Sequence, residues 1–222
     1  MKKIIKFGLY EQANIGDGSG AASLWTHPED KRIESVKSFD YWLRIARLAE
    51  EINLDLLFFG DVSGIYDTYK NSPATAISWG VELPAHDPLM ILPALASATR
   101  NLAFGVTISA SYAHPFAHAR GMSTLDHLTG GGSGWNIVTS WLSGTADNFG
   151  KSEHPPHAVR YRIAKEHVSV VRGLWDSWDD DAFTRNKQSG EFFAPAKLHA
   201  LNHQGELFQV KAPLNTPPSR HL

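Results

Sequence analysis

Gly134-Trp135-Asn136-Ile137-Val138-Thr139-Ser140 is the stretch of sequence that decides the fold of this chain. Its apolar part predicts a short strand over Trp135–Val138, which ends in the polar residues Thr139 and Ser140. Directly before it, a helix is predicted over Pro115–Leu128, and the glycines at 130–132 end that helix. A helix followed by a short buried strand with polar residues at its end is typical of the catalytic rim of a parallel β/α barrel.

The same alternation of strand and helix extends from this stretch back toward the N-terminus and on to Trp175. Strands are expected over Ile4–Tyr10, Leu54–Phe59, Leu102–Ser109 and Trp135–Val138, and helices over Phe39–Ile52, from Asp87-Pro88 onward, over Pro115–Leu128 and over Arg160–Trp175. The continuous apolarity of Leu54–Phe59 is typical of a strand that is buried on both faces in a parallel sheet. Four strands, each followed by a helix, favour the parallel α/β class over a sandwich or a bundle.

The alternation ends after Trp178. Glu191–Val210 combines glycine, proline and short β-like pieces, which predicts an extended or hairpin insertion. A proline-rich segment follows from Lys211, and we expect this linker to be mobile. We therefore expect residues 1–178 to form the N-terminal half of a TIM-type barrel, truncated after about four β/α units. Residues 179–222 are expected to form an insertion and a linker without a second domain.

The composition excludes several classes of protein. Apolar residues make up 42% of the 222 residues and charged residues 20%, as in ordinary soluble domains. The net charge of −2 provides no broad attraction to nucleic acid or to membranes. The absence of cysteine excludes disulfides, thiolate catalysis and zinc–thiolate sites. No apolar run is long enough to span a bilayer. We expect a cytoplasmic protein without a nucleic-acid or membrane partner.

Polar residues gather where the predicted strands end. Asp61 follows the second strand, Thr107 lies near the end of the third, and Asn136 lies in the fourth. His157 and Tyr161 are four residues apart at the start of the last helix, a spacing that allows both to face one ligand. In a barrel these positions converge on one face. Asn136 stands between bulky apolar residues, so we expect it to be buried and to need partners for its amide.

Purely structural interpretations of these residues stay open. Asp61 after a glycine is also common in turns, and Thr107 is a good strand former in its own right. Asn136 could have a structural role, and His157 and Tyr161 could be a surface pair.

A metal-dependent barrel hydrolase is a rival interpretation, with candidate ligands Asp61, His86, His114, His118 and His127. His114 and His118 are four residues apart, a spacing that can chelate a metal ion. However, no His-x-His follows the first strand and no glutamate completes a set, so no metal site is predicted. The glycine-rich stretches at 16–20 and 130–134 are neither a P-loop nor a dinucleotide fingerprint, although the first could hold a phosphate.

Several long segments, in the same order, resemble the bacterial luciferase-like flavin-dependent monooxygenases, in particular the nitrilotriacetate and dibenzothiophene-sulfone monooxygenase group. The strongest anchors are Phe59–Asp61, Ser123–Leu128, Gly134–Ser140, Asn148–Gly150, Arg160-Tyr161, Val170–Trp178, Gly205–Phe208 and Pro213–Asn215. The resemblance implies a β/α barrel that uses reduced FMN, delivered by a separate NAD(P)H-dependent flavin reductase. With O₂ it would oxidise a small organic substrate, possibly with C–N or C–S cleavage.

The same resemblance assigns the candidate cofactor-binding residues. Asp61, Thr107, His157 and Tyr161 match flavin-contacting positions, and Asn136 matches a polar residue beside the flavin ring. The catalytic residues are not assigned, because the flavin carries the oxygen chemistry. We also expect a homo-oligomer.

The sequence departs from the family pattern in three places and in its length. Gly121, the turn 131–133 and the pair Ala158-Val159 lack charged residues that the family usually has. Family members are roughly twice as long and complete an eight-unit barrel. The alternative is therefore a non-catalytic, truncated remnant that acts at most as a weak flavin-binding or interaction module.

Overall fold

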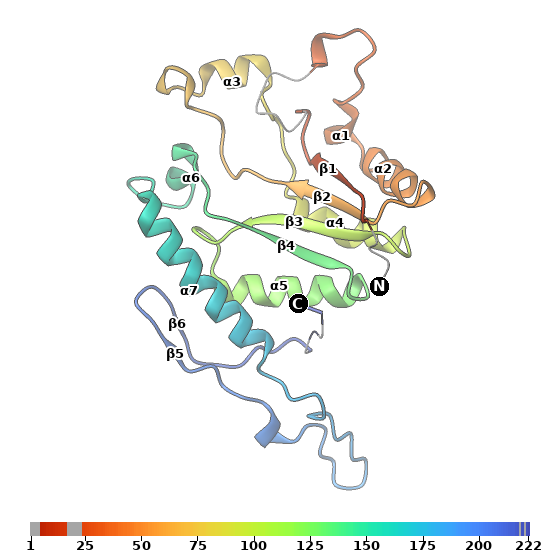
Figure 1. Cartoon of the computed structure of the whole chain (residues 1–222), viewed down its shortest axis with the longest axis vertical. Helices are drawn as coiled ribbons and strands as arrows, with labels where there is room; N and C mark the ends of the chain where they lie inside the picture. The colour runs from red at the N-terminus through yellow and green to blue at the C-terminus, as the bar shows by residue number, and fades with distance from the viewer. Residues whose placement is uncertain (1–4, 17–23, 218, 220) are drawn as a thin grey trace.

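The computed structural model describes residues 5–16, 24–217, 219, 221 and 222. Its centre is a parallel sheet with the strand order β1-β2-β3-β4 (Figure 1). The strands are β1 (Gly8–Gln12), β2 (Leu56–Gly60), β3 (Ala103–Ser109) and β4 (Ser133–Val138). The predicted parallel α/β class is therefore confirmed. The sheet of these four strands is open, with β1 and β4 at its edges.

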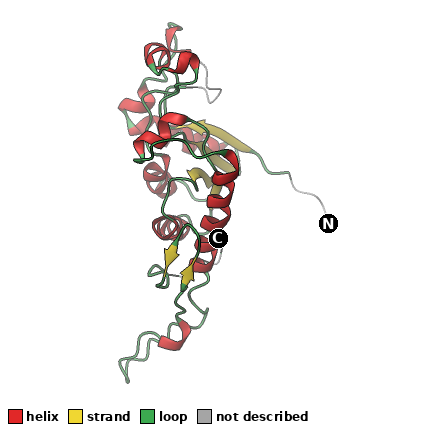
Figure 2. Cartoon of the chain, turned by 90° about the vertical axis from the view of Figure 1, so that its left-hand side faces the viewer, coloured by secondary structure: helices red, strands yellow, loops and turns green. Residues whose placement is uncertain are grey.

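Helices α2 (Phe39–Glu51), α4 (Pro88–Ser97) and α5 (Pro115–Leu128) connect the strands and cover one face of the sheet. In Figure 1, α4 is seen behind β3, and the side view of Figure 2 shows an elongated molecule with the four-stranded sheet in its upper half. Alternate strand residues point to the helices and form the core with them: Leu57, Phe59, Phe104 and Val106 from the sheet, and Trp42, Leu92, Leu95 and Met122 from the helices. This alternation follows from the two-residue period of a strand.

Local sequence explains where the helices begin. The side chain of Ser38 caps α2 by accepting a hydrogen bond from the backbone N–H of Asp40. Asp87 caps α4 in the same way, and Pro88 occupies its first turn, as predicted. None of the helices in the described residues is both long enough and apolar enough to cross a membrane.

Helix α7 (His157–Trp175) packs against α5, and the C-terminal segment packs against both. This segment contains the antiparallel hairpin of β5 (His203–Gln204) and β6 (Gln209–Val210), within the region where the sequence predicts a hairpin. Glu166 of α7 anchors it, because its Oε1 accepts hydrogen bonds from His203 Nε2 at 3.0 Å and from the backbone N–H of Phe208 at 2.8 Å.

The described residues of the segment from Lys211 are anchored on α5 and α7, where the sequence predicts a mobile linker. Leu214 is only 1% exposed and belongs to the apolar cluster between α5 and α7. Its backbone N–H donates to Ser177 Oγ at 3.1 Å, and its carbonyl accepts from Trp178 Nε1 at 2.8 Å. Ser123 Oγ of α5 donates to the carbonyl of Pro217 at 2.9 Å. The burial of Leu214 stabilises a path that its proline-rich sequence alone does not predict.

Several element boundaries differ from the prediction. Strand β1 begins at Gly8 rather than at Ile4, which lies outside the described residues, and α7 begins at His157, three residues before the predicted Arg160. Residues 17–20 of the glycine-rich loop also lie outside the described part. The unpredicted helices are too short to show a period: α1 (Glu34–Lys37), α3 (Ala74–Trp79), α6 (Ser143–Asn148), η1 (Leu24–Thr26), η2 (Tyr69–Asn71) and η3 (Pro195–Lys197).

Candidate functional site

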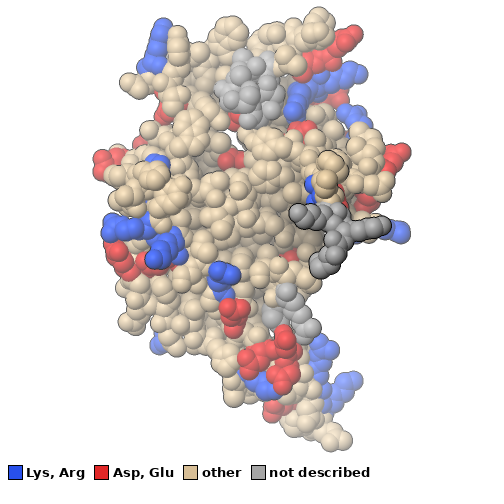
Figure 3. All heavy atoms as spheres, viewed as in Figure 1, with Lys and Arg blue, Asp and Glu red and all other residues tan. Residues whose placement is uncertain are grey.

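The carboxyl end of the sheet and the amino-terminal half of α7 enclose a cavity of about 730 Å³. Asp61 lines it from the end of β2, residues 137–142 from the end of β4, and His157, Tyr161 and Lys165 from α7. Its wall is mixed, because apolar Leu142, Ala164 and Val168 stand beside these polar groups. Seen from the uncovered face of the sheet, few charged groups lie over β3 and β4 (Figure 3).

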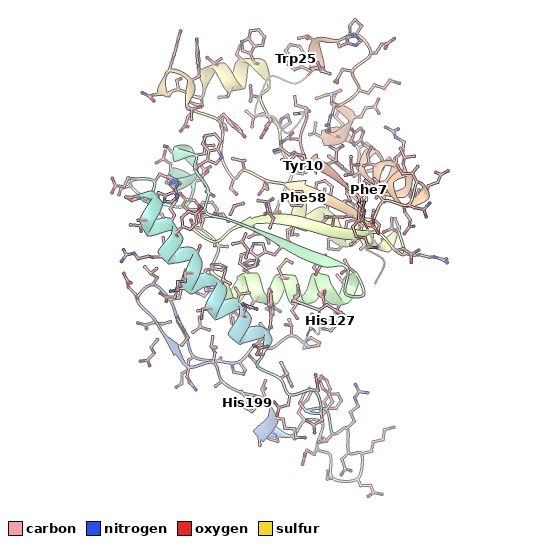
Figure 4. The ribbon with its side chains drawn as sticks, viewed as in Figure 1. Phe7, Tyr10, Trp25, Phe58, His127 and His199 are labelled. Atoms are coloured by element: carbon pink, nitrogen blue, oxygen red, sulfur yellow. The ribbon has the colours of Figure 1, made fainter. Side chains whose placement is uncertain are left out.

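The uncovered face of the sheet carries two large rings outside the lining of this cavity. Tyr10 of β1 and Phe58 of β2 are register partners, and their ring centroids are 5.4 Å apart (Figure 4). Gly105 is the next register partner of Phe58, and a Cβ there would lie 2.8 Å from the Phe58 ring. Glycine at 105 thus makes room for this aromatic pair on the face that a barrel would turn inward.

Asp61 has an unusual protonation equilibrium. Burial, and secondarily the nearby Asp87 carboxylate, raises the pKa of Asp61 to about 6. Hydrogen bonds from the backbone of Val62 and the side chain of Ser63 favour the ionised form but do not offset this. A carboxyl group with such a pKa in a cavity is a candidate for ligand binding or proton exchange.

Thr107 and Asn136 are register partners on β3 and β4, and Asn136 Nδ2 donates to Thr107 Oγ1 at 3.0 Å. Thr107 is buried, at 6% exposure. Asn136 is exposed, which corrects the expectation that it would be buried. The reason is the position of β4 at the edge of the described sheet, where no further strand covers it.

His157 and Tyr161 form a pair on the first turns of α7. Their ring centroids are 4.5 Å apart, as the spacing of four residues predicts for a helix, and both side chains are exposed along the large cavity. The helix has no side-chain cap hydrogen bond and no acidic residue in its first turn. Its amino end therefore keeps its positive potential beside the cavity.

The five predicted residues are neighbours, although they do not line one space. Asp61, His157 and Tyr161 line the large cavity. Asp61 and Thr107 also line an adjoining cavity of about 160 Å³. Asn136 lines neither of these two cavities and is joined to the group by its hydrogen bond to Thr107.

Sequence reasoning missed a network beside the smaller cavity. His154 lies between two side chains: its Nδ1 is 2.6 Å from Tyr112 Oη and its Nε2 is 2.5 Å from Arg160 Nη1. Tyr112 stands 42 residues away from His154, so no local period connects them. The only signal in the sequence is the presence of His154 and Arg160 near the start of α7.

The rival metal site does not assemble. Within the described part of the chain, no group of three or more histidine, aspartate or glutamate side chains could hold a metal ion. His118 is buried and its Nδ1 lies 2.9 Å from Nε2 of His167. His114 instead caps α5 by accepting from the backbone N–H of Phe116.

The model of the luciferase-like monooxygenase family matches residues 5–221. The chain belongs to the luciferase-like monooxygenase family. It is 42% identical to the long-chain alkane monooxygenase of Geobacillus thermodenitrificans (strain NG80-2) over 99% of this chain and 49% of that protein. It is 35% identical to nitrilotriacetate monooxygenase component A of Aminobacter aminovorans, over 87% of this chain and 43% of that protein, which confirms the sequence-based resemblance.

Solved structures of this family have the same fold over the matched part. A crystal structure of long-chain alkane monooxygenase superimposes with a TM-score of 0.92 at 42% identity, over 99% of this chain and 50% of that chain. A riboflavin lyase solved with modified FMN and riboflavin has a TM-score of 0.89 at 36% identity, over 98% of this chain and 48% of that chain. The chain thus spans about half the length of the curated relatives and solved structures that it matches.

Proposed function

We propose that this chain supplies FMN-binding residues to a monooxygenase that uses reduced FMN and O₂ to oxidise a small organic substrate. The observation that carries the proposal is the convergence of Asp61, His157 and Tyr161 on one cavity of about 730 Å³. This volume is within the range of roughly 300–1,000 Å³ that small-molecule and cofactor sites occupy.

Polar side chains in the cavity lining support a ligand with many oxygen acceptors. Thr139, Ser140 and Lys165 line the large cavity. Hydroxyl and ammonium groups donate hydrogen bonds. The carbonyl, hydroxyl and phosphate oxygens of FMN fit such donors.

The first turns of α7 suit the phosphate of the same cofactor. His157 and Lys165 provide cationic or donor groups along the cavity, and the uncapped helix end provides backbone N–H groups. We therefore propose that the phosphate binds near His157 and Tyr161 and that the ring lies toward Asp61 and Thr107. Reduced FMN, when bound, would supply the electrons that activate O₂. The apolar wall, which includes Leu142, would exclude water from the reacting atoms.

We further propose that a separate NAD(P)H-dependent flavin reductase supplies the reduced FMN. The relative whose name includes "component A" supports a system of more than one component. About half of each relative lies outside the match, and we propose that a complete site also needs that half of the barrel.

Titration of FMN and of anaerobically reduced FMN into the purified chain tests the proposal, with binding followed by flavin fluorescence and by calorimetry. We expect His157→Ala to raise the Kd by about 10- to 150-fold, because a hydrogen bond to a charged group is worth about 1.5–3 kcal/mol. Tyr69→Phe, a change at an exposed side chain outside the lining of the large cavity, is the matched control. If neither form of the flavin binds at millimolar concentration, the proposal fails for this chain.

A further inference from the structure

The network of Tyr112, His154 and Arg160 determines where the proton of His154 lies. A guanidinium group only donates hydrogen bonds, so His154 Nε2, which is 2.5 Å from Arg160 Nη1, must be the acceptor. His154 is therefore neutral and carries its single ring proton on Nδ1. Burial, and then the charge of Arg160, lowers the pKa of His154, in agreement with a neutral ring.

With this tautomer, the hydroxyl hydrogen of Tyr112 is not donated to His154. The Nδ1–H of His154 donates to Tyr112 Oη at 2.6 Å, so the hydroxyl oxygen is the acceptor in that bond. Burial raises the pKa of Tyr112, which keeps its O–H protonated. Tyr112 makes no second hydrogen bond to the described residues, so its O–H can donate to a ligand.

Tyr112 lines the cavity of about 160 Å³ that adjoins the large one at Asp61. The ring of Phe149 stacks on Tyr112, with centroids 5.0 Å apart and planes 21° apart, and this restricts the ring. The cavity is lined by carboxyl groups of Asp61 and Asp87, which disfavour an anion. At roughly 30 Å³ for each water molecule, it has room for about five waters, and so for a group of a few heavy atoms.

We propose that Tyr112 donates a hydrogen bond to a neutral carbonyl oxygen of the organic substrate, bound in this smaller cavity. His154 and Arg160 are positioning residues that orient the Tyr112 hydroxyl. The inference rests on the proposed function, because the large cavity would hold the flavin beside this substrate group.

Cyclopentanone, a neutral ketone with six non-hydrogen atoms, is the probe. The protein is labelled with tyrosine carrying ¹³C at Cζ, and the Tyr112 signal is assigned by its loss in Tyr112→Phe. We expect the ketone to shift the Tyr112 signal of the wild-type protein in the presence of FMN. We expect Tyr112→Phe to raise the Kd of the ketone about fivefold, as for the loss of one hydrogen bond between neutral groups, with the Kd of FMN within about twofold.

Two variants of His154 separate positioning from a general loss of structure. His154→Leu removes the donor to Tyr112 and should change both the Tyr112 signal and the ketone Kd. His154→Asn places an amide N–H near the position of Nδ1 and should restore both in part. Tyr69→Phe, at an exposed side chain outside both cavity linings, should change neither.

An unmoved Tyr112 signal at saturating ketone, no saturable binding of the ketone, or an equal ketone Kd in Tyr112→Phe would overturn the inference. The wild-type shift is measured without any substitution, so misfolding of a variant cannot decide the result. Failure of the wild-type protein to bind FMN would reject the flavin proposal instead. The ketone titration without FMN would then decide the inference, since a shift of the Tyr112 signal supports it and an unmoved signal overturns it.

Discussion

Asn136 and Thr107 are linked across two strands of the sheet: Asn136 Nδ2 donates to Thr107 Oγ1 at 3.0 Å. The two residues are direct register partners of β4 and β3, so backbone pairing and side-chain pairing reinforce each other. Thr107 is buried and lines the smaller cavity, whereas Asn136 is exposed at the sheet edge. Through this bond, Asn136 can orient the Thr107 hydroxyl, although Asn136 does not line the cavity itself.

Asn136→Ala should therefore weaken FMN binding by about 1–3 kcal/mol, the usual cost of leaving a polar partner unpaired. Calorimetric titration measures the change. In a double-mutant cycle with Thr107→Val, the two effects should be less than additive, because the two residues share one hydrogen bond. Strictly additive effects would show that the bond does not couple the two side chains in ligand binding.

Asp61→Asn should stabilise the ligand-free protein at neutral pH. The folded-state pKa of about 6 exceeds the ordinary value of 3.8, so folding favours the protonated carboxyl. Its stabilising contribution is fully present below about pH 4 and is lost as the pH rises through 6. Ionised Asp61 then costs up to about 3 kcal/mol, at about 1.4 kcal/mol for each unit of pKa. Urea unfolding should show that Asp61→Asn has a free energy of unfolding about 1–3 kcal/mol higher than the wild-type protein at pH 7.5. At pH 4 the two proteins should differ little. An equal gain at both values would contradict the raised pKa.

The protein should lose stability in mild acid through His118 and His167. Burial lowers the pKa of His118 to about 3 and that of His167 to about 4, each below the ordinary value of 6.5. Their contribution is therefore present above pH 6.5 and is lost as the pH falls toward 4. Each of these two histidines should lower the free energy of unfolding by about 2 kcal/mol between pH 6.5 and pH 5.

Urea unfolding across this range measures the slope of stability against pH. His167→Gln removes one titrating ring and should make the slope shallower, whereas His27→Gln, at an exposed side chain, should leave it unchanged. A slope that stays the same in His167→Gln would show that the buried pair does not govern acid sensitivity.

Oxygenase activity should require a flavin reductase in the assay. The reason is that the sequence contains no nicotinamide fingerprint. Oxygen uptake is measured with FMN and NADH, with and without a reductase. Turnover by the purified protein with NADH alone would contradict the two-component proposal.

The described sheet should associate with another chain. The exposed apolar side chains near its edges include Ile5 at 74% and Phe7 at 63% beside β1, and Ile137 at 47% on β4. Exposed apolar groups and unpaired strand edges favour pairing with other chains. Light scattering during size exclusion should show dimers or larger species. A monomer across micromolar concentrations, with a cooperative melt, would show that the edges are protected within the chain.

Local sequence was sufficient for the secondary structure that builds the site. The apolar run before Gly60, the capping residues Ser38 and Asp87, and the period of α7 predicted the alternating elements. The parallel sheet followed from that alternation. The same local patterns placed Asp61 and Thr107 at or near strand ends and Tyr161 at the start of a helix, because these positions depend only on residues nearby in the chain. The structure extends that helix back to His157, which the local pattern did not predict.

The tertiary structure alone decided the contacts between residues far apart in the chain. It paired Tyr112 with His154 and His118 with His167, it packed Leu214 between α5 and α7, and it left Asn136 exposed. The periods of helices and strands determine which face a residue occupies, but not which distant face packs against it. That choice depends on how side chains from separate elements fill a common volume, and no single segment of the sequence contains this information.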